Sequence, residues 1–360
     1  MNRKGLLPAD PLPCIVRAQR RVWLLLPLLL AAVFVLELCL GSVFIAPRTV
    51  LRILLGDLEA PDSWRQIVLL FRLPRAITAL LAGASLGMAG LQMQTLFRNP
   101  LADPSVLGVN SGASLGVALV VLAAGTTSFG ASVTQVAGAG LALVVASSLG
   151  SLAVMSLVLV LARRVENSLT LLIVGLMVGY LTTSGVTVLM SFALEQQLRR
   201  YIGWTFGSFA GVTWRQMTIL APVLILALSL SLLQAKTMNA LLLGERYARS
   251  LGLGVRATRM LLTLSASVLA GCVTAYCGPI GFLGIAVPHL ARSLMRTTDH
   301  HVLAPVVLLV GAILALISDL VAQAPGTALA LPLNAITSLV GAPIVLSVVL
   351  QRRQGLEAGA

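Results

Sequence analysis

Long apolar segments separated by short polar ones run through almost the whole chain. Several of them, such as 22–45 and 133–162, reach the roughly 20 residues that a helix needs to cross a bilayer. The segments lie at 22–45, 76–97, 105–124, 133–162, 169–193, 216–235, 258–277, 280–295, 302–323 and 332–350. This pattern predicts an all-α polytopic membrane protein with about ten transmembrane helices.

Two stretches depart from this simple pattern. The segment at 280–295 is short and contains Pro288, and "GWTFGSFAGVTW" at 203–214 is too short to span. Trp204 and Trp214 in the latter suit an interfacial or re-entrant element. The first segment is too long for the apolar part of a signal peptide and lacks a clear cleavage site, so we expect an uncleaved first helix.

Composition agrees with a membrane protein. The chain is 58% hydrophobic and 10% charged, whereas soluble domains carry about 25% charged residues. We expect a basic cytoplasmic arm at 1–21, one transmembrane domain at 22–350 and a cytoplasmic tail at 351–360. The cysteines form no CxxC pair and are expected to be buried free thiols: Cys14, Cys39, Cys272 and Cys277.

The net charge of +13 has a membrane explanation. Lys and Arg accumulate in the cytoplasmic loops of polytopic proteins, and no basic surface interleaved with aromatic residues argues for nucleic acid. Ten spans place both termini on one side, and most of the basic residues then lie in the cytoplasm. The exception is an outward-facing cluster, which would suit an acidic partner: Arg48, Arg52, Arg65, Arg72 and Arg75.

Two segments resemble an inverted repeat. "RLPRAITALLAGASLGMAG" at 72–90 and "RATRMLLTLSASVLAG" at 256–271 each place two arginines three residues apart before an apolar helix rich in small residues. With both termini in the cytoplasm, the first arginine pair lies outside the cell membrane and the second lies inside. Inverted repeats of this kind are typical of transporters.

The polar stretch "FRNPLADP" at 97–104 interrupts two apolar segments. Pro100 disfavours a helical Asn99 and ends the preceding helix, while Asp103 and Pro104 suit the start of the next one. Irregular backbone at membrane depth is tolerated only where protein or water surrounds it. We therefore expect a turn beside a pore or a packed core, with an ordinary interhelical loop as the alternative.

These stretches, taken together, resemble a known family. "RLPRAITALLAGASLGMAGLQMQTLFRNPLADPSVLGVNSGASLG" at 72–116 is similar to the FecCD/BtuC-like permeases of iron-siderophore, heme and cobalamin ABC importers. Matching segments follow in the same order: "GWTFGSF" (203–209), "ERYARSLGLGV" (245–255), "GPIGFLGIAVPHLAR" (278–292) and "LPLNAITSLVGAPIVL" (331–346). The resemblance implies the BtuC-like type II ABC importer fold, ten transmembrane helices with an inverted internal repeat, in the bacterial cytoplasmic membrane.

The resemblance also implies partners and site residues. It implies a homodimer that binds two cytoplasmic ATPase subunits and one periplasmic or lipid-anchored binding protein. The cytoplasmic gate of the family maps to Asn99, Pro100, Leu101, Asn167 and Ser168. The segment that couples to the ATPase maps to Gly244, Glu245, Arg246, Ala248, Arg249, Ser250, Leu251 and Gly252; a charged solvated loop is the alternative there. Binding-protein docking maps to Arg72 and Arg75, but relatives often carry a further arginine where this chain has Gln323.

No catalytic, cofactor or metal site is expected in this chain. It has no GxxxxGK[ST] motif, so ATP and Mg²⁺ would bind in the partner ATPase. His300 and His301 have no third ligand nearby in the sequence. The expected function is import of an iron chelate, ferric siderophore before heme or cobalamin. The alternatives are a proton-coupled secondary transporter that uses Glu37 or Asp319, and a membrane enzyme, for which no cluster of His, Asp or Glu argues.

Overall fold

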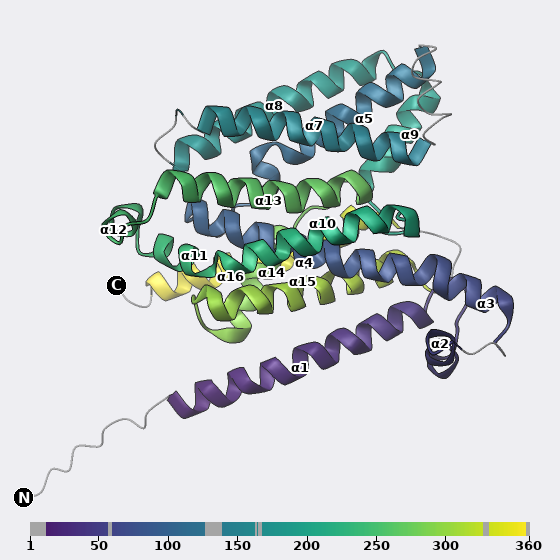
Figure 1. Ribbon diagram of the computed structural model, residues 1–360, viewed down its shortest axis with the longest axis horizontal. Coiled ribbons are helices and arrows are strands. Elements are labelled where there is room, and N and C mark those ends of the chain that lie inside the picture. The colour runs from purple at the N-terminus through teal and green to yellow at the C-terminus, as the bar shows by residue number, and fades with distance from the viewer. Residues whose placement is uncertain are drawn as a thin grey trace, which may run out of the picture.

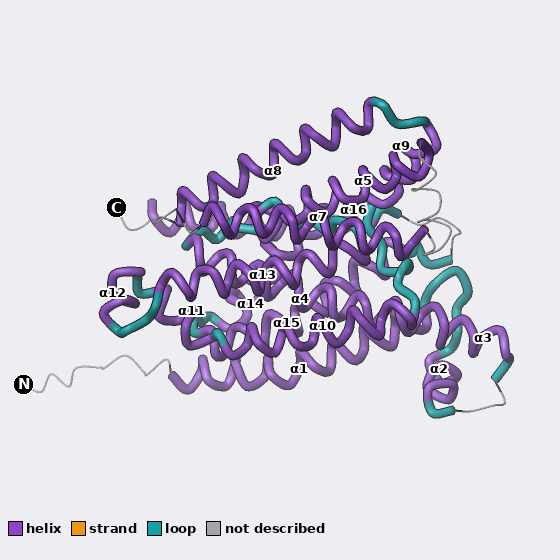
Figure 2. Tube along the Cα trace, turned by 45° about the horizontal axis from the view of Figure 1, so that its top comes forward, coloured by secondary structure: helices purple, strands orange, loops and turns teal. Residues whose placement is uncertain are grey.

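The computed structural model describes residues 12–56, 60–126, 139–162, 164, 168–326 and 331–357. Over these residues the chain is helical, with turns between the helices and no strand (Figure 2). The elements are α1 (Leu12–Cys39), α2 (Pro47–Leu54), α3 (Asp62–Gln66), the π-helix η1 (Ile67–Arg72), α4 (Leu73–Phe97), the 3₁₀ helix η2 (Pro104–Leu107), α5 (Val109–Thr126), α7 (Ala139–Ala162), α8 (Ser168–Ser191), α9 (Glu195–Thr205), α10 (Trp214–Leu233), α11 (Ala235–Leu242), α12 (Glu245–Ser250), α13 (Val255–Cys277), α14 (Leu283–Met295), α15 (His300–Ala322) and α16 (Leu333–Glu357).

All ten predicted apolar segments are helices, namely α1, α4, α5, α7, α8, α10, α13, α14, α15 and α16. Seven helices in the described part of the chain are long and apolar enough to cross a membrane. The apolar parts of α5 and α16 are shorter, and α14 has only 13 residues. The protein is a multi-pass membrane protein whose apolar helices differ in length.

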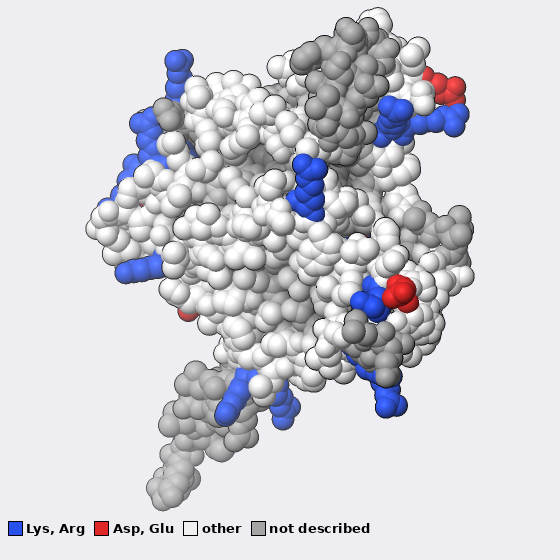
Figure 3. All heavy atoms as spheres, turned by 45° about the vertical axis from the view of Figure 1, so that its right-hand side comes forward, with Lys and Arg blue, Asp and Glu red and all other residues white. Residues whose placement is uncertain are grey.

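The long helices form one bundle with two distinct ends (Figure 1). We call them the α12 end, where α1 begins and α16 finishes, and the α2 end, where α2 and α3 lie. On the face that Figure 3 shows, few charged side chains lie between the ends, and Lys and Arg form small separate groups. An uncharged flank with charged ends is what a helix bundle in a bilayer requires.

The first helix was predicted at the wrong position. It covers Leu12–Cys39 rather than 22–45, so part of the predicted N-terminal arm is helical. After Cys39 the chain turns toward α2, and Arg72 binds the carbonyl groups of Leu38 and Cys39 at the end of the helix. Apolar composition alone did not show this boundary, because Val43, Phe44 and Ile45 are apolar but lie outside the helix.

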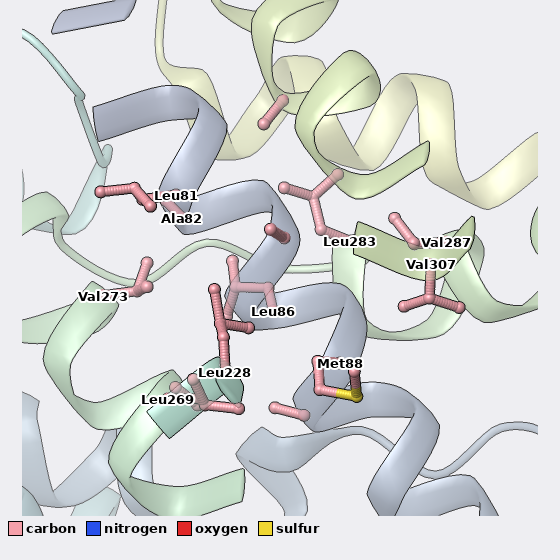
Figure 4. Close-up of a cluster of buried hydrophobic side chains, with 14 of the residues drawn as sticks. Leu81, Ala82, Leu86, Met88, Leu228, Leu269, Val273, Leu283, Val287 and Val307 are labelled. Atoms are coloured by element: carbon pink, nitrogen blue, oxygen red, sulfur yellow. The ribbon is translucent and has the colours of Figure 1, made fainter. Parts of the chain in front are cut away.

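The helix α4 forms the centre of the core (Figure 4). Leu86 and Met88 of α4 lie among side chains of α10, α13, α14 and α15, including Leu228, Leu269 and Val287. These residues are buried. Since lipid is about as apolar as leucine, close van der Waals packing rather than removal from water holds these membrane helices together.

Small residues let several helices approach backbone to backbone. A β-carbon at Gly90 of α4 would lie 1.8 Å from the Gly284 carbonyl oxygen of α14, and one at Gly83 would lie 2.1 Å from the Gly311 carbonyl oxygen of α15. A β-carbon at Gly116 of α5 would lie 1.9 Å from a backbone oxygen of α7. Close approach through small residues is a common way to hold membrane helices together.

The predicted inverted repeat has a structural counterpart. The helices α4 and α13 pack side by side and run in opposite directions (Figure 1). Each begins with an arginine that pairs with a carboxylate, Arg75 with Asp319 and Arg259 with Glu245. The two pairs lie at opposite ends of the bundle, as an inverted repeat requires.

Candidate functional site

The short helix α12 projects from one end of the bundle (Figure 1). It follows Gly244, whose φ is 117°, and ends before Gly252, whose φ is 82°. Both values favour glycine. Arg246 and Arg249 are exposed, whereas Ala248 is fully buried. The two glycines thus bracket a short helix, and α12 presents its basic side chains outward.

An ion pair ties α12 to the bundle. Glu245 Oε1 accepts a hydrogen bond of 3.0 Å from Arg259 Nη2 of α13. The Arg259 side chain is 7% exposed and that of Glu245 is 32% exposed. One end of α12 is therefore anchored, while its arginines stay accessible.

A hollow of about 760 Å³ separates α12 from the end of α4. Its lining comes from two segments of the chain, residues 95–98 at the end of α4 and residues 241–247 around α12, with 242 not among the lining residues. The hollow brings the predicted coupling segment next to the residue that precedes the predicted gate.

The predicted gate residues Asn99, Pro100 and Leu101 form a tight turn. Asn99 Oδ1 accepts a hydrogen bond of 3.0 Å from the Leu101 amide, an arrangement that stabilises turns locally. The Pro100 carbonyl oxygen lies 2.9 Å from His289 Nε2 of α14. We call residues 99–101 the gate turn.

The chain after the gate turn packs on α14. Asp103 Oδ1 accepts a hydrogen bond of 2.8 Å from the Ser105 amide and caps η2. A β-carbon at Gly284 would lie 2.7 Å from Asp103 Oδ2. Ala102 is buried, whereas Leu101 is 45% exposed, so the segment is packed on one side only. Of the other gate residues, Asn167 lies outside the described residues, and Ser168 is the first residue of α8.

Arg72 and Arg75, the predicted docking residues, are engaged inside the bundle. Arg72 is 8% exposed. Its Nη1 donates to the carbonyl oxygens of Leu38 and Cys39 at 2.8 and 2.9 Å, and its Nη2 donates to the Val43 carbonyl oxygen. These bonds join η1 to the end of α1, a structural role that the sequence did not indicate.

Arg75 makes a bidentate ion pair with Asp319 of α15. Its Nε lies 2.7 Å from Oδ2 and its Nη2 lies 2.9 Å from Oδ1. The side chains are 22% and 1% exposed. Two parallel charge-assisted bonds give a strong and directional contact, so the Arg75 guanidinium is turned into the bundle and not toward solvent.

Glu37 and Gln323 extend this pair to α1. Gln323 Nε2 donates to Glu37 Oε1 and lies 3.5 Å from Asp319 Oδ2. Glu37 is 1% exposed. The residue that departs from the family pattern therefore connects two buried carboxylates, and both acids of the secondary-transporter alternative lie in one packed cluster between helices.

A second hollow, of about 370 Å³, lies between α5 and α8. Its lining combines hydroxyl and amide groups with small and apolar residues and includes no charged side chain: Ser105, Asn110, Ser111, Ser114, Leu176, Gly179, Tyr180 and Thr183. Asn110 Oδ1 also accepts a bond of 2.8 Å from Thr274. The sequence reading missed this group, although the polar residues of 108–114 were a signal for it.

His300 is part of a hydrogen-bond network. Its Nε2 lies 2.9 Å from Thr95 Oγ1 and its Nδ1 lies 2.7 Å from Asn239 Oδ1. Within the part of the chain that the structure describes, no three His, Cys, Asp or Glu residues gather in a way that suits a metal ion. His300 instead connects α15 to α4 and α11.

The fold and these segments match known proteins. The FecCD transport family matches residues 29–351. The chain belongs to the FecCD transport family. The vitamin B12 import system permease protein BtuC of Salmonella arizonae is 38% identical over 334 residues, which cover 91% of this chain and 94% of that protein. The BtuC protein of Escherichia coli strain HS is 36% identical over 337 residues, with coverages of 92% and 96%.

A solved structure agrees with this assignment. An inward-facing conformation of a metal-chelate type ABC transporter superimposes with a TM-score of 0.78 at 28% identity, covering 92% of this chain and 99% of that one. The protein is thus the permease subunit of an ABC transporter. The family assignment makes the chain a membrane subunit of a transporter, and it favours the ABC importer over the secondary-transporter alternative.

Proposed function

We propose that this chain forms a homodimeric permease in the bacterial cytoplasmic membrane that carries a bulky metal chelate, with cobalamin as the first candidate. The single observation that supports cobalamin as the cargo is the sequence identity of 36–38% to BtuC proteins over nine-tenths of the chain. Ferric siderophore, which the sequence motifs favoured, and heme are the other candidates. Two ATPase subunits at the α12 end would drive transport, and both termini would be cytoplasmic.

The α12 end suits an ATPase subunit. It offers exposed arginines on α12 beside a hollow of about 760 Å³. A partner that inserts into this hollow touches α12 and the end of α4 at the same time. In the bound state, we propose, residues 244–252 take up the movement of the ATPase and the gate turn responds to it.

The face of α8 suits a second copy of the chain. Among the membrane-spanning helices of the described chain, α8 has the smallest buried share, 22% against 61% for α13 and α15. Met177, Tyr180 and Leu181 on it are more than half exposed. A second copy on this face would cover these side chains and close the polar hollow between α5 and α8 into part of a shared pathway. A lining without charges suits a cargo that must pass without being held tightly.

Docking of a binding protein is better assigned to exposed arginines at the α2 end. Arg48 lies on the amphipathic helix α2 and is exposed, whereas Arg72 and Arg75 are engaged within the bundle. Charged groups at the rim of an interface mainly raise the encounter rate and set orientation. We therefore propose that Arg48 contributes to docking. Arg72 and Arg75 would stabilise the helices that form this end of the bundle without touching the binding protein.

The test is purification of the tagged chain from its native membrane in mild detergent, followed by uptake assays. A stoichiometric ATPase subunit is expected, and its absence, including after crosslinking, would contradict the importer. Membrane vesicles from cells with and without the chain are then given radiolabelled cobalamin, a ferric hydroxamate and heme in parallel. ATP-dependent uptake of cobalamin alone supports the proposal, and uptake of another chelate reassigns the cargo.

A further inference from the structure

Arg98 crosses from the end of α4 to the segment before α12. Its Nη2 donates to the Leu241 carbonyl oxygen at 2.8 Å and lies 3.4 Å from that of Leu242. Those carbonyl groups belong to the last turn of α11, where helical carbonyls lack partners within their own helix. A charged donor makes such bonds roughly twice as strong as a neutral one.

The guanidinium group of Arg98 also fits against Gly244. A β-carbon at Gly244 would lie 3.1 Å from Arg98 Nη2. Gly244 immediately precedes α12 and has a φ of 117°. The position at which α12 begins is therefore defined partly by the side chain of a residue that ends α4.

The backbone of Arg98 is fixed as well. Its φ is 48°, a left-handed conformation that is uncommon for residues other than glycine. The next residue, Asn99, opens the gate turn, and Pro100 contacts His289 of α14. Arg98 thus joins the start of α12, through its side chain, to the gate turn, through its backbone.

We propose that Arg98 is a positioning residue that transmits a displacement of α12 to the gate turn. The inference rests on the coupling and gate roles in the proposed function and adds the connection between them. The hollow of about 760 Å³ lies between α12 and the end of α4, and Arg98 is among the residues that line it. Residues 241–244 lead directly into α12. A displacement of α12 that moves this segment relative to α4 either carries the Arg98 guanidinium along or breaks its bonds to Leu241 and Leu242.

The decisive variant is Arg98→Gly. Glycine adopts a positive φ readily, so the substitution removes the side chain while keeping the backbone of the turn. Arg296→Gly is the matched control, because Arg296 also ends a helix, α14, with a φ of 48°, and its side chain is exposed. Arg98→Lys keeps the charge and has a single nitrogen with which to reach the Leu241 carbonyl.

Each variant is reconstituted in liposomes with its ATPase and binding protein, and three quantities are measured: retained ATPase, ATP hydrolysis and cargo moved per ATP. We expect Arg98→Gly to retain the ATPase and to hydrolyse ATP, but to move about tenfold less cargo per ATP, equivalent to roughly 1.4 kcal/mol of lost coupling. Arg98→Lys should recover part of this loss, and Arg296→Gly should match the wild type.

Two results would overturn the inference and leave the importer intact. In the first, Arg98→Gly moves as much cargo per ATP as the wild type. In the second, Arg98→Gly loses the ATPase while Arg296→Gly keeps it, which would make Arg98 a docking contact. If the wild-type chain itself binds no ATPase, the proposed function fails, and the inference fails with it.

Discussion

Arg75 of α4 and Asp319 of α15 form a bidentate ion pair, with Nε–Oδ2 and Nη2–Oδ1 distances of 2.7 and 2.9 Å. They are separated by 244 positions in the sequence, and the Asp319 side chain is almost fully buried. The pair therefore connects a helix from the first third of the chain to a helix from the last third.

Loss of one partner of this pair should destabilise the fold strongly. Asp319→Ala leaves the Arg75 charge without its partner, and breaking a buried pair in this way costs about 3–5 kcal/mol. A thermal unfolding scan in detergent should show a large drop in the midpoint for Asp319→Ala and a smaller drop for the double variant Arg75→Ala/Asp319→Ala. The exposed pair of Glu195 and Arg199 is the control, because surface pairs contribute about 0–1 kcal/mol. Equal effects of Asp319→Ala and Glu195→Ala would contradict this account.

Variants of Arg72 and Arg48 should have different effects, because Arg72 has a structural role and Arg48 is proposed to act in docking. Arg72→Ala removes the donor to three backbone carbonyl groups, and a hydrogen bond to a charged group contributes about 1.5–3 kcal/mol. We expect a lowered unfolding midpoint for Arg72→Ala. Arg48→Glu should leave the midpoint unchanged and reduce the association rate of the binding protein, more strongly at low salt. Biolayer interferometry on the detergent-solubilised complex measures that rate, and an unchanged rate would remove Arg48 from the docking surface.

The contact between Gly90 and Gly284 should not tolerate a side chain. A methyl group at Gly90 would lie 1.8 Å from a backbone oxygen, so α4 and α14 would have to separate. Overpacking of this kind costs about 1–3 kcal/mol and at times more. Gly203→Ala is the control, since a β-carbon there meets no atom within 4 Å. The yield of monodisperse protein by gel filtration should fall for Gly90→Ala alone.

The exposed face of α8 should meet a second copy. Leu181 is 74% exposed on α8, and Leu226 on α10 is 62% exposed and serves as the control. Under mild oxidation in membranes, Leu181→Cys should form a disulfide-linked dimer in higher yield than Leu226→Cys. The described native thiols do not interfere, because Cys39 and Cys277 are buried and Cys272 is half-buried. Dimers from Leu226→Cys alone would place the interface on α10 instead.

Asp299 should give α15 a pH-dependent cap. Asn239 Nδ2 and the His301 amide donate to Asp299 Oδ1 at 2.6 and 2.9 Å, and these bonds hold the pKa of the Asp299 carboxyl below its usual value. A lowered folded-state pKa means that the stabilisation is present above the ordinary pKa of 3.8 and is lost as the pH falls through the folded-state value. Asp299→Ala should cost about 1 kcal/mol at pH 7, as for other helix N-caps.

The test compares unfolding midpoints of the wild type and Asp299→Ala at pH 7 and at acidic pH. The difference between the two proteins should be largest at pH 7 and should shrink below pH 4. A difference that is independent of pH would mean that the carboxylate charge does not contribute, and that the side chain acts only by its shape.

The sequence predicted the helices well because apolar length is a strong signal in a membrane. The bounds of α12 also have a local signal in the sequence, since Gly244 and Gly252 adopt positive φ angles that favour glycine. The end of α1 could not be predicted, because it depends on Arg72, which lies 33 and 34 positions away from the carbonyl groups that it binds.

The two arginines of "RLPR" show the limit of local reasoning. A charged residue near a span end suggests exposure, yet the partners of Arg75 and Arg72 come from α15 and from the end of α1. Glu37 is similar, because its neighbour Gln323 becomes known only when α1 and α15 are placed together. Contacts between helices far apart in the sequence require the tertiary structure.

The glycine contacts also have a mechanical consequence. The helix α4 contacts the backbone of α15 at Gly83 and that of α14 at Gly90. If these helices slid along one another, a larger residue of one helix would meet the backbone of the other, so sliding is blocked. The same holds for α5 and α7 at Gly116. In the proposed transport cycle we therefore expect the helices within each of these two groups to move together, and the groups to tilt rather than slide.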